Sequence, residues 1–235
     1  MTPLPTVLIP GLYATPRLFF GQLPALWRFG PVTVADHTRS NDLDALARGI
    51  LADAPPRFAL AGLSMGGALA LSIMRQAPER VARLALLDAT ARPEPAEGRP
   101  IREAAIAELR AGRLDELVDG SFPLLVHGDR VDDAELRATM REMQRTTGAE
   151  AAIRQVEAYM NRPDARPGLP AVAVPTLVLV GDSDQLTPPD RAAELAGGIP
   201  GALLVTIPRC GHISTLEEPE LVTRALEEWL TARDR

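Results

Sequence analysis

Short apolar runs alternate along the chain with longer stretches in which apolar residues recur at helical spacing. Nearly every position in these runs is apolar, and they cover residues 6–10, 32–36, 57–63, 84–88, 176–182 and 202–208. Continuous apolar runs are typical of strands buried on both faces of a parallel sheet, whereas a strand with one solvated face alternates. The pattern therefore predicts six strands in one parallel sheet.

Helical spacing fills most of the intervals between these strands. It occurs at about 16–28, 43–54, 65–77, 189–197 and 218–232. Strands that alternate with helices form βαβ units, in which helices cover both faces of the sheet. The predicted fold class is α/β, with a doubly wound parallel sheet of about six strands.

One interval interrupts this alternation. Residues 92–170 contain no convincing strand but several helical patterns, and proline-rich stretches at 92–100 and 162–175 flank the interval. Prolines end helices and stiffen connections. We expect a helical cap at 92–170, inserted into a core formed by residues 1–91 and 171–235.

The composition is that of an ordinary globular protein. The chain has 235 residues, 46% of them hydrophobic and 24% charged, which suffices for a sizeable core. Its net charge of −6 gives no general attraction to nucleic acid or to anionic membranes. No apolar run approaches the roughly 20 residues that cross a bilayer, and the first residues lack the pattern of a signal peptide. We expect a cytoplasmic protein without nucleic-acid or membrane partners.

A serine between glycines follows the third predicted strand. Residues 61–67 read AGLSMGG, so that Gly62, Ser64 and Gly66 fit the pattern G-x-S-x-G. Where this motif links a strand to a helix, the sharp turn requires small neighbours and lifts the serine hydroxyl above the edge of the sheet. The amide of Met65 then points into the same space, at the positive end of the helix. Ser64 is the candidate nucleophile, and a purely structural glycine-rich turn is the alternative.

A serine hydroxyl needs a base to take its proton, and the base needs an orienting acid. Of the three histidines, His212 lies in a loop after the last predicted strand. The carboxyl ends of parallel strands are where such sheets gather their active groups, so His212 is the candidate base. We expect His37 to be satisfied at the surface and His127 to serve as a loop or helix-capping residue.

Three aspartates compete for the role of the acid. Asp182 and Asp184 follow a buried strand in one loop, and Asp88 ends an earlier strand. The strand before Asp184 directly precedes the strand that leads to His212, so the two loops should be neighbours. The order Ser64, Asp184, His212 also matches nucleophile, acid and base. We choose Asp184, assign Asp182 to the turn, and keep Asp88 as the alternative acid.

Together these motifs resemble the α/β-hydrolase superfamily, in the branch with a helical cap. The segment AGLSMGG resembles its nucleophile elbow, GDSDQLTP its acid loop, CGHISTLEEPE its histidine loop, and LIPGLYATPRLF its oxyanion loop. The resemblance implies a triad of Ser64, Asp184 and His212. It also implies an oxyanion hole formed by the backbone amides of Leu12 and Met65, and a sheet that lacks the two leading strands of the family.

The chain departs from the family pattern at two places near the expected site. Pro10-Gly11 stands where many members have His-Gly, which changes the wall and the polarity of the pocket but leaves the amide of Leu12 in place. The segment ADHTRSND replaces the usual Arg-Gly-His-Gly-type turn after the next strand, so that turn carries no inference about the substrate.

The resemblance implies a serine hydrolase that cleaves small to medium carboxylic esters through an acyl-enzyme, without a metal or another cofactor. Lactonase, C–C bond hydrolase or perhydrolase activity on the same triad is the alternative, followed by a non-catalytic ligand receptor. The cap should roof the site, and packing between cap helices is the alternative role for its apolar residues. The expected pocket residues are Tyr13, Met140, Met143, Tyr159 and Met160. The single cysteine, Cys210, is expected to be a bystander.

Overall fold

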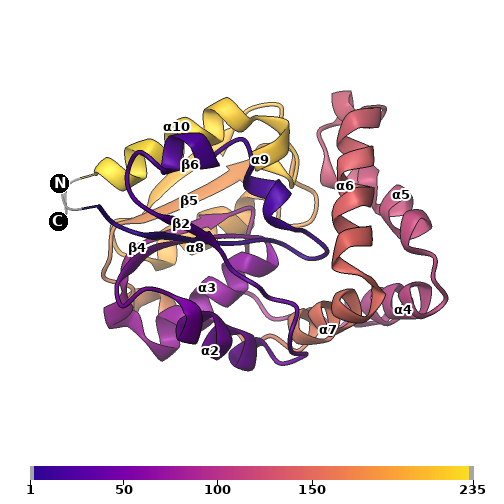
Figure 1. Ribbon diagram of the computed structural model, residues 1–235, viewed down its shortest axis with the longest axis horizontal. Helices are drawn as coiled ribbons and strands as arrows, with labels where there is room; N and C mark the ends of the chain where they lie inside the picture. The colour runs from indigo at the N-terminus through magenta and orange to yellow at the C-terminus, as the bar shows by residue number, and fades with distance from the viewer. Residues whose placement is uncertain (1–2, 233–235) are drawn as a thin grey trace.

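The computed structural model describes residues 3–232, and a parallel sheet of six strands lies at its centre (Figure 1). The order of strands is β2-β1-β3-β4-β5-β6, and every neighbouring pair is parallel. The predicted sheet is therefore confirmed. The strands are β1 (Thr6–Ile9), β2 (Val32–Val34), β3 (Phe58–Leu63), β4 (Val81–Leu87), β5 (Thr176–Gly181) and β6 (Leu203–Ile207).

Helices cover both faces of this sheet, so the inner strands β1, β3, β4 and β5 are almost entirely buried, whereas the edge strands β2 and β6 are partly exposed. Successive residues of β1 point to opposite faces, so Val7 and Ile9 belong to one core cluster and Leu8 to another. The first cluster includes residues of α2 (Leu43–Asp53), α3 (Met65–Gln76) and α8 (Pro189–Gly198). The second includes residues of α1 (Leu23–Leu26) and α10 (Pro219–Thr231).

Two predicted helices are divided in the structure. The segment predicted at 16–28 forms a short 3₁₀ helix, η1 (Pro16–Phe19), followed by α1, which has a proline in its first turn. The last predicted helix is preceded by the short α9 (Ser214–Glu217). Pro219 has no amide hydrogen to continue α9, so a new helix begins there.

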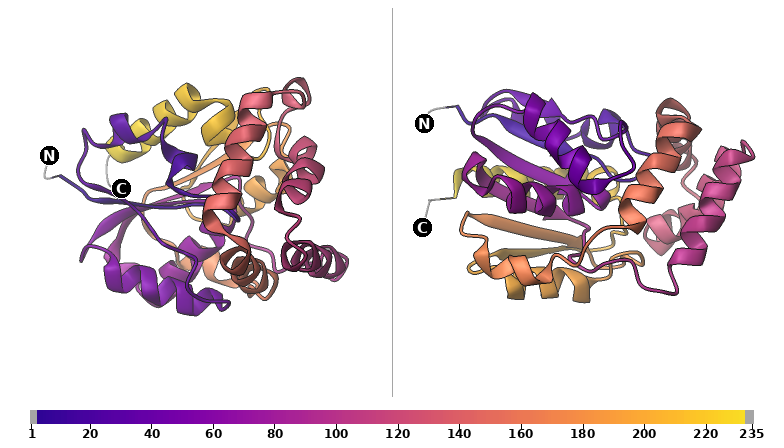
Figure 2. Two further views of the ribbon diagram at one scale, coloured as in Figure 1. Left: turned by 45° about the vertical axis from the view of Figure 1, so that its right-hand side comes forward. Right: turned by 90° about the horizontal axis from the view of Figure 1, so that it is seen from below.

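Four helices lie between β4 and β5 in the sequence and beyond the carboxyl ends of the strands in space (Figure 2). They form the helical insertion that the sequence indicates, although its division from the core at residues 92 and 170 stays a prediction. Their bounds are α4 (Arg99–Arg110), α5 (Leu114–Leu125), α6 (Ala134–Thr147) and α7 (Ala149–Met160).

The helices are short compared with the thickness of a bilayer. The longest, α6, has 14 residues, whereas about 20 are needed to span the hydrocarbon core. Within residues 3–232, no helix is both long enough and apolar enough to cross a membrane.

Candidate active site

Ser64 occupies a strained turn between β3 and α3. Its φ of 56° and ψ of −114° lie in a region that residues other than glycine rarely adopt, and such strain is concentrated at functional sites. A Cβ on Gly62 would lie 2.1 Å from the carbonyl oxygen of Gly66, and a Cβ on Gly66 would lie 2.0 Å from that of Ile9. The two glycines are required because β3, α3 and the end of β1 meet there without room for side chains.

Three side chains from separate loops meet at this turn. The Nε2 atom of His212 lies 2.8 Å from the Oγ atom of Ser64, and its Nδ1 atom lies 2.8 Å from Oδ2 of Asp184. The loops follow β3, β5 and β6, so all three reach the carboxyl edge of the sheet. With the ring proton on Nδ1, His212 donates to Asp184 and accepts from Ser64, which is the tautomer that a general base requires.

The carboxylate of Asp184 is held by the residues that follow it. Its Oδ1 atom accepts hydrogen bonds from the amides of Leu186 and Thr187, at 2.8 and 2.9 Å, and its Oδ2 atom accepts one from the Thr187 hydroxyl at 2.8 Å. Burial alone would raise the pKa of Asp184, but the charge of His212 and these hydrogen bonds hold it below its ordinary value. Thr187 was not among the residues predicted from the sequence. Its position three residues after the candidate acid was the only feature that could have indicated this role.

The environment of His212 favours the protonated ring. Burial lowers the pKa of His212, but the charge of Asp184 and its hydrogen bond outweigh burial, and the pKa lies above its ordinary value. Asp184 therefore stabilises the imidazolium that forms when Ser64 loses its proton.

The two other aspartates have different partners. Asp88 is fully buried and bonds the amide of Gly181 at 3.0 Å and the hydroxyl of Ser214 at 2.5 Å, with no hydrogen bond to His212. Burial and the negative charge of Asp184 raise the pKa of Asp88 to about 8. Asp88 therefore differs from Asp184 in both its contacts and its charge.

Asp182 connects the acid loop to the histidine loop. Its carboxylate accepts hydrogen bonds from the amides of Arg209 and Cys210, at 2.9 and 3.2 Å. We expected Asp182 to bond amides of its own loop, such as that of Asp184. Its amide partners lie in the histidine loop instead. The end of β6 brings the amides of the histidine loop within reach, so Asp182 fixes that loop from the neighbouring strand.

The oxyanion loop lies directly against Ser64. A Cβ on Gly11 would lie 3.3 Å from the Cβ of Ser64. The amides of Leu12 and Met65 donate to no acceptor within residues 3–232, as expected for donors kept for a ligand. His37 holds this loop, with its Nε2 atom 3.0 Å from the carbonyl oxygen of Gly11.

The surface role expected for His37 is wrong, because the turn after β2 carries this ring under the oxyanion loop, where it is 2% exposed. Burial lowers the pKa of His37. The neutral ring is therefore favoured, and with its proton on Nε2 it donates to Gly11.

The end of α5 contacts the histidine loop. The carbonyl oxygen of Leu125 accepts hydrogen bonds from the amides of His212 and Ile213, at 2.8 and 3.3 Å. His127 caps the 3₁₀ helix η3 (Gly128–Arg130), because its Nδ1 atom accepts a hydrogen bond from the amide of Asp129 at 3.1 Å. This agrees with its expected structural role. The insertion thus touches the backbone of the candidate base.

The expected pocket residues lie in two environments. Met140 and Met143 pack in the core cluster that contains Phe122 of α5. The ring of Tyr159 is buried beside the guanidinium groups of Arg102 and Arg162, with its centroid 5.2 and 3.8 Å from their central carbons. Met160 is buried and Tyr13 is partly exposed. Contact of these side chains with a substrate stays a prediction.

Cys210 is fully buried, and burial raises the pKa of its thiol. The thiolate is the reactive form of cysteine, and this environment disfavours it. A bystander role agrees with this setting.

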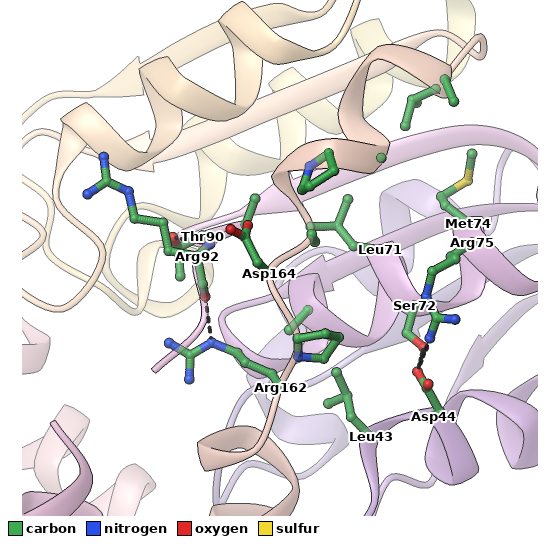
Figure 3. Close-up of a pocket in the computed structure, with 18 of the residues that line it drawn as sticks. Leu43, Asp44, Leu71, Ser72, Met74, Arg75, Thr90, Arg92, Arg162 and Asp164 are labelled. Atoms are coloured by element: carbon green, nitrogen blue, oxygen red, sulfur yellow. Dashed lines mark hydrogen bonds and ion pairs between the residues drawn. The ribbon is translucent and has the colours of Figure 1, made fainter. Parts of the chain in front are cut away.

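A cavity of about 640 Å³ lies between helices α2 and α3 and the segment that follows α7 (Figure 3). Leu43 and Asp44 of α2 and Leu71 of α3 line one side, and the proline-rich segment from Arg162 to Val172 lines the other. None of the three residues of the candidate triad lines it. The cavity lies beneath the segment that returns from the insertion to β5.

No group of three or more histidine, cysteine, aspartate or glutamate residues in the described part of the chain could hold a metal ion. The donor set at Ser64 is a hydroxyl, an imidazole and a carboxylate joined to one another by hydrogen bonds. Such a set is suited to nucleophilic catalysis.

Comparisons with known proteins agree with this geometry. A family model described as the alpha/beta hydrolase family matches residues 6–225. The chain is 28% identical over 211 residues to a pimeloyl-[acyl-carrier protein] methyl ester esterase of Nitrosomonas europaea, with 85% of this chain and 83% of that protein covered.

Two solved structures are similar over nearly the whole chain. A thermophilic esterase from Thermogutta terrifontis, with malate bound, has a TM-score of 0.88 and 29% identity, and 97% of this chain and 89% of that chain are covered. The enol-lactonase from Burkholderia xenovorans has a TM-score of 0.87 and 26% identity, and the match covers 99% of this chain and 93% of that chain. Both carry the fold seen here.

Proposed function

Because the chain belongs to the alpha/beta hydrolase family, we propose that it is a serine hydrolase of small to medium carboxylic esters. The observation that carries the proposal is the continuous hydrogen-bonded path from Ser64 through His212 to Asp184, with both links at 2.8 Å. Similarity to an esterase in sequence and to another in structure supports the choice of ester substrates.

The reaction begins when His212 takes the proton of Ser64 as Oγ attacks the ester carbonyl carbon. Asp184 accepts the Nδ1 hydrogen bond and stabilises the imidazolium without becoming protonated. The tetrahedral intermediate collapses, His212 gives its proton to the leaving alcohol, and an acyl-enzyme remains on Ser64. Water then attacks the acyl carbon as His212 takes its proton, and a second tetrahedral intermediate forms. Its collapse breaks the bond to Oγ and releases the acid, while His212 returns the proton to Ser64.

The negative oxygen of each tetrahedral intermediate needs fixed donors. The unpaired amides of Leu12 and Met65 are the proposed donors, because Gly11 lies against Ser64 and Met65 follows it directly. One donor of this kind contributes about 3 to 4 kcal/mol in comparable enzymes. His37 keeps the loop of Leu12 in place through the carbonyl of Gly11.

The helical insertion is the proposed roof of the site, as a cap at residues 92–170. We assign the apolar part of the pocket to five side chains whose flexible or aromatic surfaces suit small acyl or alcohol groups. They are Tyr13, Met140, Met143, Tyr159 and Met160.

Hydrolysis of lactones is the second candidate. It needs the same nucleophile, base and oxyanion hole, because a lactone is a cyclic ester. Similarity in structure to an enol-lactonase at 26% identity favours it over the other reactions known on this fold.

The test is to replace Ser64 by alanine and to measure turnover of a panel of p-nitrophenyl esters and lactones. We expect Ser64→Ala to lose at least about 10³ in kcat, as removal of the nucleophile does in comparable triads, and to lose labelling by a fluorophosphonate. Ser40→Ala, on the surface loop before α2, is the matched control and should react normally. Turnover by Ser64→Ala near the wild-type rate would overturn the proposal.

A further inference from the structure

Two arginines of the insertion share one buried carboxylate. Glu94 lies 3.1 Å from Nε of Arg102 and 2.5 Å from Nη1 of Arg162. The side chain of Glu94 is 7% exposed and that of Arg162 is 6% exposed. The three groups together carry one net positive charge. A surplus charge in such a place is unfavourable unless solvent or a ligand balances it.

The surplus charge resides on Arg102. Arg162 is engaged on several sides, because it also donates to the carbonyl oxygens of Arg92 and Tyr159, at 2.9 and 2.8 Å. Arg102 uses only Nε, and its two terminal nitrogens have no hydrogen-bond partner within residues 3–232. Its side chain is 29% exposed, so Arg102 is not sealed inside the protein as Glu94 is.

Arg102 lies beside the oxyanion loop. Ile106, one helical turn later on the same face of α4, belongs to an apolar cluster against which Leu12 and Tyr13 pack. Burial raises the pKa of Tyr13 to about 12, and the positive charge of Arg102 opposes this rise. At His212, burial and the charge of Arg102 both oppose the rise in pKa that Asp184 causes. The charge of Arg102 therefore acts on both the oxyanion loop and the candidate base.

Gln155 of α7 brings a second donor to the same loop. Its Oε1 atom accepts a hydrogen bond from the amide of Tyr13 at 2.9 Å, and the residue is fully buried. Its Nε2 atom has no partner within residues 3–232. A buried donor without a partner is unfavourable, and an acceptor on a ligand would relieve this. Tyr159, over which Arg102 lies, is one turn further along α7.

We propose that Arg102 and Gln155 form a carboxylate-binding subsite of the active site, so that the preferred substrates are esters or lactones with a second, ionised carboxyl group. The planar fork of a guanidinium matches the two oxygens of a carboxylate, and the side-chain amide of Gln155 adds an unpaired donor beside the oxyanion loop. This inference rests on the proposed function and narrows its substrate class.

The first experiment compares two esters of the same shape. Monomethyl glutarate carries a carboxylate where methyl 5-methylhexanoate carries an isopropyl group. We expect the wild-type enzyme to have the higher kcat/KM for monomethyl glutarate, by about tenfold, mainly through a lower KM. Equal or reversed preference would overturn the subsite.

Three variants assign the preference to residues. In Arg102→Gln the ratio of the two kcat/KM values should fall about tenfold, and in Arg102→Lys only part of it should return, because the charge is kept but the planar fork is lost. Arg110→Gln removes the same charge from the exposed end of α4 and should leave the ratio unchanged. A ratio that is the same in Arg102→Gln and in the wild type would overturn the proposal.

A binding measurement separates this inference from the proposed function. Calorimetry with glutarate needs no turnover, and we expect the Kd to rise about tenfold in Arg102→Gln but not in Arg110→Gln. If neither ester is cleaved while Arg102 still controls glutarate binding, the ester hydrolase proposal fails and the subsite stands. If glutarate binds both proteins equally, the subsite is wrong even if esters are cleaved.

Discussion

Asp88 and Asp184 are both buried carboxyl groups near His212, but they differ in their hydrogen-bond partners and in the direction in which their pKa values are shifted. Asp184 accepts bonds from two amides, the Thr187 hydroxyl and the imidazole, so its charged form is favoured. Asp88 is fully buried, has the negative charge of Asp184 nearby and has fewer donors, so its neutral form is favoured. At the scale of single residues, the charges and donors that oppose burial decide whether a carboxyl group can serve as the acid of a triad.

The first residue-scale prediction concerns which aspartate orients the base. Asp184→Asn should lower kcat by about 10⁴, because an amide favours the wrong tautomer of His212. Asp88→Asn should cost far less, since its carboxyl group contacts Gly181 and Ser214 and not the imidazole. Both variants are measured on one activated ester, with circular dichroism to establish folding. An inactive Asp88→Asn beside an active Asp184→Asn would reverse the assignment.

The second residue-scale prediction concerns stability and pH. The pKa of Asp88 is about 8 in the folded protein against an ordinary 3.8, so between these values the native state holds a proton that the unfolded state has lost. The contribution of Asp88 to the free energy of unfolding therefore falls as pH rises, by at most about 1.4 kcal/mol per pH unit.

Asp88→Asn cannot ionise, whereas Asp184 and His212 titrate in both proteins. The stability of the variant relative to wild type should therefore increase between pH 5 and pH 8 in urea denaturation. A difference that is constant with pH would show that Asp88 does not titrate in this window.

At the scale of elements, the histidine loop is clamped between β5 and the end of α5. A Cβ on Gly211 would lie 2.6 Å from the carbonyl carbon of Val126, so the loop and the insertion touch backbone to backbone. The bond from the amide of His212 to Leu125 crosses the same contact. The position of the base thus depends on a helix that is distant in sequence.

This contact predicts that Gly211→Ala impairs catalysis. The added methyl group must push the loop away from Val126, which moves His212 from Ser64, and a shift of about 1 Å in such geometry costs on the order of 10² in rate. Gly128→Ala, two residues after Val126, adds a methyl group that meets no atom within 4 Å and should retain activity. The comparison of kcat for the two variants is the measurement, and equal rates would contradict it.

At the scale of the whole molecule, one buried carboxylate joins the insertion to the core. Glu217 of α9 is 1% exposed. Its Oε2 atom accepts from the amide of His127 at 2.7 Å, and its Oε1 atom accepts from the amide of Gly211 at 2.9 Å. The insertion and the loop of the base therefore share an anchor, and they should loosen together.

Glu217→Gln tests this anchor. One oxygen becomes an NH₂ group that faces an amide N–H, so the free energy of unfolding should fall by about 1–3 kcal/mol, with a parallel fall in kcat. Glu218→Gln is the adjacent control, because Glu218 has only a 3.9 Å contact with Arg130 and is partly exposed. Urea denaturation measures the difference, and equal stability of the two variants would refute the shared anchor.

The sequence by itself determined the sheet, the place of the insertion and the residues proposed for the chemistry. Continuous apolar runs specify the inner strands of a parallel sheet because both of their faces are covered, and G-x-S-x-G specifies a turn because only glycine fits where three backbones meet. Both features involve residues that are close together in the sequence, so a short sequence pattern is enough to predict them.

Only the tertiary structure decided which groups surround those residues. The burial of His37 under Gly11, the bond from Thr187 to Asp184, and the surplus charge on Arg102 depend on contacts between elements. A histidine or an arginine in a sequence carries no mark of its partners, because burial and charge balance are set by the three-dimensional packing of distant segments. The identity of the groups follows from the chain, whereas their protonation and their freedom to bind a ligand follow from the fold.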